Sequence, residues 1–336
     1  MPSDVHANHI YNQTMKMFGS VPEPAFETED EQERVWGRAW GCDNDVGQLR
    51  VVLMHRPGEE MKVVDPTKRI EEIGSFGDPE KGWYWQSDSI PPVGEMQRQH
   101  DSLVEALRKE GVEVIFLEGV ADGRLKSCYT RDSVIAVKGG AIICRMAPRI
   151  RRGEERIVSR TLAKHDVPIL RTLNGTAIME GGSFAWLNPK TAVIGRSIRV
   201  NEDGAAQVGE VLRRQGVELI CVDLCGYRIH IDGALVMIDV DLAIVEPTQL
   251  SYWFLERLKA LKIRTIEVTP ADSRWVVNCL AVRPGRILMP EGASNGTLDQ
   301  LARHNVEVVV VPYDRMQLNG GGIHCSTSPL IRDSIA

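Results

Sequence analysis

The sequence contains no uninterrupted apolar run close to the roughly 20 residues that a membrane-spanning helix requires. Residues 1–40 are polar and acidic, and no apolar stretch among them precedes a small-residue cleavage site, so no signal peptide is predicted. We therefore expect a cytoplasmic protein that has no membrane partner.

Paired cysteine motifs are also missing. The chain has seven cysteines, an odd number, and no two of them form a C-x-x-C pair. This usage indicates free thiols in a reducing compartment and not a disulfide framework. Cys221 and Cys225 are close in sequence, but without a second pair they do not predict a zinc site.

Positive charge is not concentrated in a way that favours nucleic-acid binding. The formal net charge is −6, the sequence pI is about 5.8, and acidic and basic residues are interspersed. The one dense basic stretch, residues 149–160 (RIRRGEERIVSR), contains two glutamates, and we interpret it as the charged face of a helix. No nucleic-acid partner is expected.

What the sequence does contain is a short phrase that recurs five times, each time after a helix-like stretch. The copies begin at intervals of about 43 to 55 residues and are rich in β-branched residues. They are 110-EGVEVIFL-117, 165-HDVPILRT-172, 215-QGVELICV-222, 262-KIRTIEV-268 and 304-HNVEVVVV-311. This recurrence predicts a closed repeat architecture and not a set of unrelated domains.

Each of the first four copies is followed by two apolar runs that are joined by a turn, a pattern typical of β-hairpins. The hairpins are expected at residues 133–144, 183–195, 234–246 and 278–290. The fifth copy runs out of chain after residues 323–331, and we expect residues 49–57 to supply its missing strand.

Five units of helix, strand and hairpin around one axis predict an α/β fold, a five-bladed α/β propeller with pseudo-fivefold symmetry. Residues 46–336 would form this single catalytic domain, and residues 1–45 would be an N-terminal extension. The alternative is a doubly wound open sheet. It is disfavoured because the hairpins imply antiparallel pairs and because no G-x-G-x-x-G motif follows a first strand.

In each unit the junction between phrase and hairpin carries an unusual polar group, and equivalent positions in a ring should converge. These positions are Asp132, Glu180, His230, Asp232, Asn278 and Cys325. A cysteine, a histidine and several carboxylates are typical of an enzyme site. Carboxylates pair well with a planar guanidinium, so we predict nucleophilic attack by cysteine on a guanidinium or amidine carbon. Asn278 is interpreted as a strand-end residue outside the catalytic set.

Seven motifs in order resemble the guanidino-group-modifying (pentein) superfamily, which includes arginine deiminases, dimethylarginine dimethylaminohydrolases and amidinotransferases. The resemblance extends from about residue 46 to the C-terminus. The motifs are 47-GQLRVVLMHRPG-58, 100-HDSLVEALRKEGVEV-114, 130-TRD-132, 179-MEGGS-183, 195-GRSIRVN-201, 230-HID-232 and 320-GGGIHCST-327. The resemblance also implies a five-bladed α/β propeller and implies neither a metal nor an organic cofactor.

The resemblance implies three catalytic residues. Cys325 would be the covalent nucleophile and would form a thiouronium-type intermediate. His230 would protonate the leaving amine and then activate the attacking water. Glu180 would hold the guanidinium and help to orient His230.

It also implies substrate contacts. Asp132 and Asp232 would bind the substrate nitrogens, and Arg199 would hold the α-carboxylate of an amino-acid substrate. Ser183 departs from the pattern, because arginine deiminases usually have aspartate there. Strict deimination of arginine is therefore in question.

These observations predict a hydrolase of a linear amidine, acting on the C–N bond of arginine, an N-substituted arginine or a similar guanidino compound. The products would be a ureido compound and ammonia or an alkylamine. The alternative is an amidinotransferase, in which an acceptor amine replaces water. A second alternative is a non-catalytic propeller that binds ligands or partners. A homo-oligomer is left open.

One insertion, residues 74–88 (GSFGDPEKGWYWQSD), has no counterpart in the pattern. Its Trp83-Tyr84-Trp85 cluster has two interpretations that the sequence does not separate. The cluster belongs either to the core or to a loop that covers the mouth of the site and lines a pocket.

Overall fold

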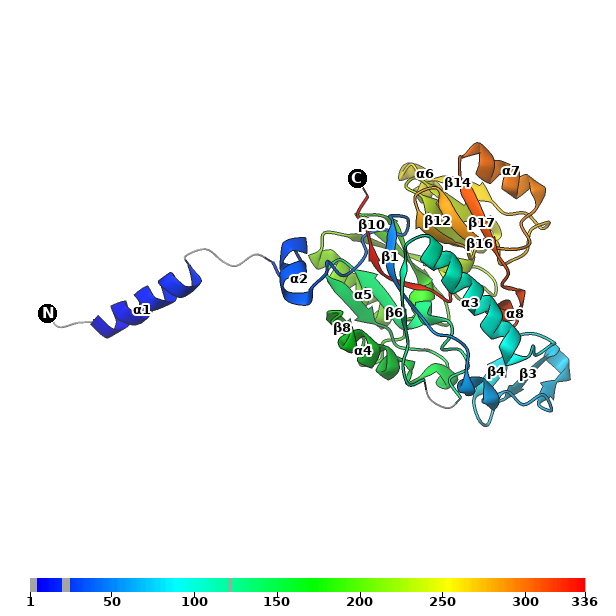
Figure 1. Cartoon of the computed structure of the whole chain (residues 1–336). Coiled ribbons are helices and arrows are strands. Elements are labelled where there is room, and N and C mark those ends of the chain that lie inside the picture. Colours follow the sequence, from blue (N-terminus) through cyan, green and yellow to red (C-terminus); the bar gives the residue numbers. More distant parts are fainter. Residues whose placement is uncertain (1–4, 20–24, 121–122, 336) are drawn as a thin grey trace.

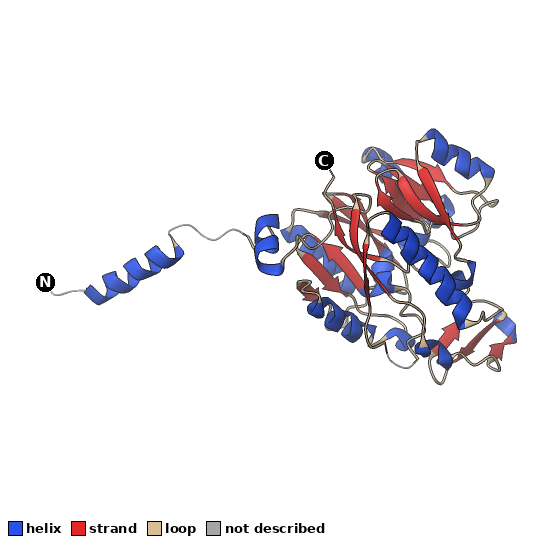
Figure 2. Ribbon diagram, in the orientation of Figure 1, coloured by secondary structure: helices blue, strands red, loops and turns tan. Residues whose placement is uncertain are grey.

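The computed structural model describes residues 5–19, 25–120 and 123–335. These residues form a mixed α/β structure in which small sheets alternate with helices (Figure 2). Near the N-terminus lie α1 (Val5–Phe18) and α2 (Glu29–Trp36), and Figure 1 shows α1 standing apart from the rest of the chain.

Five three-stranded sheets share one plan: a central strand pairs antiparallel with one neighbour and parallel with the other. The first sheet contains β18 (Ser328–Arg332), β1 (Leu49–Met54) and β5 (Glu113–Phe116), the second β6 (Val134–Val137), β7 (Gly140–Ile143) and β8 (Ile169–Thr172), and the third β9 (Phe184–Asn188), β10 (Thr191–Arg196) and β11 (Glu218–Asp223). The fourth contains β12 (Leu235–Asp239), β13 (Leu242–Val245) and β14 (Arg264–Glu267), and the fifth β15 (Leu280–Arg283), β16 (Arg286–Pro290) and β17 (Glu307–Val311).

In every one of these sheets a helix connects the central strand to its parallel neighbour, because a parallel pair needs a crossover. The helices are α3 (Val93–Lys109), α4 (Glu154–Lys164), α5 (Glu202–Arg214), α6 (Tyr252–Ala260) and α7 (Asn295–Arg303). Their apolar residues recur at helical spacing; in α3 this buries Met96, Leu103 and Leu107 on one face. The start of α5 is fixed by Asn201, whose side chain accepts a hydrogen bond from the backbone N–H of Gly204.

The first sheet pairs β1, the strand at residues 49–54, with the last strand, β18, as the repeat predicts. β1 pairs antiparallel with β18, with Val52 opposite Pro329, and parallel with β5, with Val52 opposite Val114. All five phrase copies are strands and all four hairpins are present. A doubly wound sheet is excluded, because no sheet formed by the described residues has more than three strands.

The insertion supplies two of the three strands of a sixth sheet. It consists of β2 (Arg69–Ile70), β3 (Ser75–Asp78) and β4 (Trp83–Trp85), all antiparallel, at one edge of the molecule (Figure 1). Trp83 and Trp85 are buried in a hydrophobic cluster, whereas Tyr84, on the opposite face of the strand, is only half-buried.

Short helices complete the elements. They are the 3₁₀ turns η1 (Glu59–Val63), η2 (Glu71–Ile73), η3 (Thr130–Ser133), η4 (Arg149–Arg151), η5 (Gly181–Ser183), η6 (Ile231–Gly233) and η7 (Pro247–Gln249), and the helix α8 (Asp314–Gln317).

The segment after α2 packs against the first sheet, near the pair of strands β1 and β18. Trp40 and Cys42 are buried, Gly41 forms a β-bridge with Ile331, and the Asn44 amide donates to the carbonyl of Asp333. The division of the chain at residue 46 stays a prediction. Among the described residues, no helix is both long enough and apolar enough to cross a membrane.

Candidate active site

Three of the 3₁₀ turns carry the junction residues. η3 precedes β6, η5 precedes β9 and η6 precedes β12, so each turn leads into the first strand of a different sheet. Asp132 lies in η3 and Asp232 in η6, while Glu180 and His230 immediately precede η5 and η6. The turn η5 contacts both η3 and η6, which brings together residues that are far apart in sequence.

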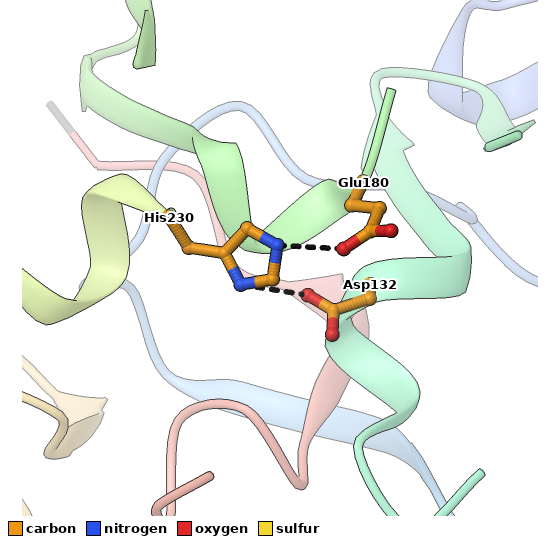
Figure 3. Close-up of side chains that lie close together, drawn as sticks. All are labelled: Asp132, Glu180 and His230. Atoms are coloured by element: carbon orange, nitrogen blue, oxygen red, sulfur yellow. Dashed lines mark hydrogen bonds and ion pairs between the residues drawn. The ribbon is translucent and has the colours of Figure 1, made fainter. Parts of the chain in front are cut away.

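His230 lies between two carboxylates (Figure 3). Its Nε2 is 2.8 Å from Oε2 of Glu180, and its Nδ1 is 3.5 Å from Oδ1 of Asp132. Gly182 makes this approach possible: a Cβ there would lie 2.5 Å from Oδ1 of Asp132 and 3.0 Å from Nδ1 of His230. The glycine in the E-G-G-S motif is therefore required for the packing of the histidine.

The two carboxylates decide the charge of this histidine. Burial disfavours the imidazolium, but the negative charges of Asp132 and Glu180 outweigh that effect and raise the pKa of His230. Burial likewise opposes ionisation of Glu180, yet the hydrogen bond to His230 lowers the pKa of the carboxyl group. The ligand-free site thus favours a protonated His230 held between carboxylates.

Cys325 is held by residues from two other sheets. Its Sγ lies 3.3 Å from Nδ2 of Asn278, which donates to it, and 3.3 Å from Oδ2 of Asp232, to which the thiol donates. Its backbone N–H donates to Oδ1 of Asn278 at 3.2 Å. Asn278 is fully buried and also donates to the carbonyl of Asp232 at 3.1 Å, so it fixes the thiol to η6.

Asn278 was excluded from the predicted set, and the structure gives it a direct contact with the sulfur. Its signal in the sequence was its position at the fourth junction. Strand-end asparagines are common, however, and nothing nearby separates this one from an ordinary turn residue.

The three glycines before Cys325 serve close packing. A Cβ on Gly321 would lie 2.4 Å from the ring of Tyr129, and one on Gly322 would lie 2.5 Å from Oδ1 of Asn278. Cys325 itself is buried, with only 7% of its surface exposed. The glycines let Asn278 reach the cysteine.

The electrostatics keep this thiol neutral. Burial, together with the negative charges of Asp232 and Asp132, raises the pKa of Cys325 well above its ordinary value. Burial opposes ionisation of Asp232 as well, but the hydrogen bond with Nδ1 of His324, at 3.0 Å, lowers the pKa of Asp232 to about 2. A neutral thiol beside an ionised carboxylate needs an added positive charge before it ionises.

Arg199 is not free in the cavity. Its Nη1 donates to Oε2 of Glu180 at 3.0 Å, and its Nη2 donates to the hydroxyl of Tyr84 at 3.2 Å. The guanidinium therefore holds a carboxylate of the protein itself, and its role as a clamp for a substrate carboxylate stays a prediction.

Arg151 is a buried arginine that is not among the site residues predicted from the sequence. Nη1 of Arg151 donates to Oδ2 of Asp132, its Nε donates to Oε1 of Glu154 at 3.0 Å, and its Nη2 donates to Oε2 of Glu154 at 2.8 Å. Arg151 and Glu154 are buried, so the interpretation of residues 149–160 as an exposed charged face is wrong for these two residues. The stretch is split instead: η4 carries Arg151 inward and α4 starts at Glu154.

A cavity of about 350 Å³, a volume that includes space open to solvent, adjoins Cys325 and His230. It is lined by Tyr84, Gln86, Lys126, Tyr129, Asp132, Arg151, Arg199, Ile229, His230, Asn319, Gly320, Gly321 and Cys325. The Trp83-Tyr84-Trp85 cluster thus divides, with two tryptophans in the core and the tyrosine at the cavity. The core interpretation is confirmed for the two tryptophans, and the interpretation of the cluster as a loop that covers the mouth stays a prediction.

Asp132, Glu180 and His230 also have the spacing of a metal site, since one potential ligand atom from each lies within 4.8 Å of the others. Arg151 and Arg199 already neutralise the two carboxylates, however. A divalent cation would have to compete with two guanidinium groups, so the charges favour a proton-transfer role over metal binding.

Comparison with known proteins agrees with this geometry. A family model described as N,N dimethylarginine dimethylhydrolase, eukaryotic, matches residues 93–332. The N(G),N(G)-dimethylarginine dimethylaminohydrolase of Pseudomonas aeruginosa is 25% identical over 238 residues, covering 70% of this chain and 88% of the relative. An arginine deiminase of Bacillus cereus is 22% identical over 417 residues, covering 87% of this chain and 98% of the relative.

Solved structures share the fold. The Pseudomonas aeruginosa dimethylarginine enzyme, a mutant complexed with citrulline, superposes with a TM-score of 0.67 at 20% identity, covering 84% of this chain and all of that chain. An amidinotransferase from Microseira wollei, of the saxitoxin biosynthetic pathway, gives a TM-score of 0.70 at 14% identity, covering 88% of this chain and 98% of that chain.

Proposed function

The chain belongs to the N,N-dimethylarginine dimethylhydrolase family within the pentein superfamily, and we propose that it is a cysteine-dependent hydrolase of a linear amidine. The substrate would be a guanidino compound, and the products a ureido compound and ammonia or an alkylamine. The observation that carries this proposal is the placement of the Cys325 thiol and of His230 on one cavity.

The first step uses the charge of the substrate. A guanidinium cation beside Cys325 stabilises the thiolate, which offsets the burial and the carboxylate charges that otherwise raise the thiol pKa. The thiol loses its proton to solvent, and Sγ attacks the central carbon while Asp232, 3.3 Å from the sulfur, stays ionised. Asn278 donates to the sulfur and orients it for this attack.

His230 then acts as the general acid. It is protonated before the reaction, because Asp132 and Glu180 raise its pKa. It donates its proton to the leaving nitrogen, the C–N bond breaks, and a thiouronium group remains on Cys325. The now neutral His230 takes a proton from water, the water oxygen attacks the same carbon, and the C–S bond breaks. The hydroxyl on that carbon gives up its proton to solvent as the carbonyl forms, and the sulfur takes up a proton from solvent.

We further infer that the five sheets are the blades of a five-bladed α/β propeller. Support comes from their shared strand order and from the pairing of β1 with β18, which ties the first strand of the body to the last. In this arrangement the three junction turns lie at one end of the axis, where η5 contacts both η3 and η6.

An amidinotransferase is the second candidate, because the Microseira wollei amidinotransferase shares the fold over most of both chains. Product analysis separates the two. In oxygen-18-labelled water a hydrolase places the label in the ureido product. A transferase instead gives a new guanidino product only when glycine, ornithine or lysine is added. Absence of both products across a panel of guanidino compounds would contradict the proposed function.

A further inference from the structure

Lys126 is a buried lysine that lines the same cavity as Cys325. Its Nζ donates to the backbone carbonyl of Asn319 and, at 2.8 Å, to the side-chain Oδ1 of the same residue. It also lies 4.3 Å from the centre of the Tyr84 ring, a cation–π distance. Nothing in the sequence pattern singled this residue out.

A series of side-chain contacts links Lys126 to His230 through three intervening residues. From His230 they run through Glu180 to Arg199, from Arg199 to the hydroxyl of Tyr84, and from the ring of Tyr84 to Lys126. A substrate whose guanidinium carbon meets Cys325 would therefore bring a group further along its own chain towards Tyr84 and Lys126.

Among the described residues, no carboxylate forms an ion pair with Lys126 in that part of the cavity, whereas Arg199 is paired with Glu180. Glu154, a carboxylate in the electrostatic environment of Lys126, is held by Arg151. Arg151 and Arg199 add positive charge close by. Burial, with a smaller effect from these two arginines, lowers the pKa of Lys126 to about 7.

This arrangement discriminates between charged groups. A substrate ammonium would meet Lys126, and the two oxygens of Asn319 that accept from Lys126 would already be engaged. A substrate carboxylate would instead pair with Lys126 and would favour the charged form of the lysine. Like charges at such close range are strongly unfavourable, whereas opposite charges attract.

We propose that the substrate is a guanidino carboxylate without a free ammonium group, and that Lys126 selects for it. This inference rests on the proposed function and narrows it: the carboxylate end binds near Lys126 and Arg199 while the guanidinium reaches Cys325. Free arginine and amino-terminated guanidines are then poor substrates.

The test compares three compounds of similar length in the ureido-product assay. They are 4-guanidinobutanoate, which ends in a carboxylate; butylguanidine, which ends in a methyl group; and agmatine, which ends in an ammonium. We expect kcat/KM to fall in that order, with at least about a tenfold difference between the first and the last. Arginine, which carries both charges, should fall below 4-guanidinobutanoate.

Two variants separate selection from a structural role. Lys126→Met should lower kcat/KM for 4-guanidinobutanoate while changing that for butylguanidine little, and Lys126→Asp should reverse the order of 4-guanidinobutanoate and agmatine. The matched control is Lys138→Asp, because Lys138 is exposed on the turn between β6 and β7 and does not line the cavity. It changes the net charge equally and should leave the ratio unchanged.

The outcomes are distinct. Turnover with agmatine or arginine preferred over 4-guanidinobutanoate would overturn this inference and leave the proposed function standing. An equal loss for all three compounds in Lys126→Met, with an unchanged ratio, would also overturn it. No turnover of any guanidino compound, and no binding of one to the Cys325→Ser variant by calorimetry, would overturn the proposed function and the inference with it.

Discussion

Replacing Asn278 by alanine removes the amide that holds the reacting cysteine. The side chain donates to Sγ at 3.3 Å and accepts from the Cys325 backbone N–H at 3.2 Å. A hydrogen bond to a charged group contributes about 1.5–3 kcal/mol, and the sulfur is charged when it attacks. We therefore expect Asn278→Ala to lose about 10- to 150-fold in kcat/KM.

Asn278→Asp makes the argument more specific. It keeps an oxygen that can accept from the Cys325 backbone, but it replaces the donor facing the sulfur with a negative charge. Two like charges 3.3 Å apart at an effective dielectric constant of 20 repel by about 5 kcal/mol, an upper limit for the effect on the thiolate. The aspartate variant should thus be less active than the alanine variant.

The assay is steady-state formation of the ureido product, with thermal unfolding of each variant to confirm that it is folded. Asn188→Ala is a suitable control, because Asn188 lies at the end of β9 and outside the cavity. A folded Asn278→Ala variant that retains at least a third of the wild-type kcat/KM would refute the role of this amide.

Three further changes have defined outcomes. His230→Ala should accumulate an adduct on Cys325 that mass spectrometry of the intact protein detects, because the histidine is needed for the later proton transfers; robust turnover by this variant would contradict its role. Arg151→Met leaves Asp132 and Glu154 buried without their shared cation, and urea unfolding should show a loss of about 3–5 kcal/mol, while a loss below 1 kcal/mol would contradict the pairing. Alkylation of Cys325 by iodoacetamide in the ligand-free protein should keep rising with pH beyond 9, because the raised thiol pKa leaves little thiolate at neutral pH; a plateau near pH 7 would contradict this.

The repeat could be predicted because short stretches of sequence indicate each of its strands and turns. Each phrase has β-branched residues suited to a strand, and each hairpin has a turn signal between two apolar runs. Equivalent junction positions then predicted that Asp132, Glu180 and His230 would meet, and they lie within hydrogen-bond or ion-pair distance.

The rest depends on contacts between distant segments. Arg151 is one of several arginines in a charged stretch, and only the inward turn of η4 shows that it meets Asp132. Tyr84 differs from its two tryptophan neighbours because side chains alternate between the two faces of β4. This alternation can be predicted only if the short segment is already known to be a strand. Lys126 donates a hydrogen bond to Asn319, which lies 193 residues further along the chain.

Several expectations concern matters on which the fold has no bearing. The location stays a prediction, namely that the protein is cytoplasmic. The partners and the site also stay predictions: no nucleic acid, no membrane, no metal and no cofactor, with a homo-oligomer left open. The substrate-binding roles of Asp132, Asp232 and Arg199 also stay predictions.

The central claim is that Cys325 carries out the cleavage of a guanidino C–N bond. The most direct measurement is a colorimetric screen for ureido products across guanidino compounds, run with wild-type protein, Cys325→Ser and Cys221→Ser. Cys221 is an exposed thiol on β11 and lines no part of the cavity. We predict product from the wild-type protein and Cys221→Ser and none from Cys325→Ser. Equal product from Cys325→Ser, or no product from the wild-type protein with any compound, would contradict the claim.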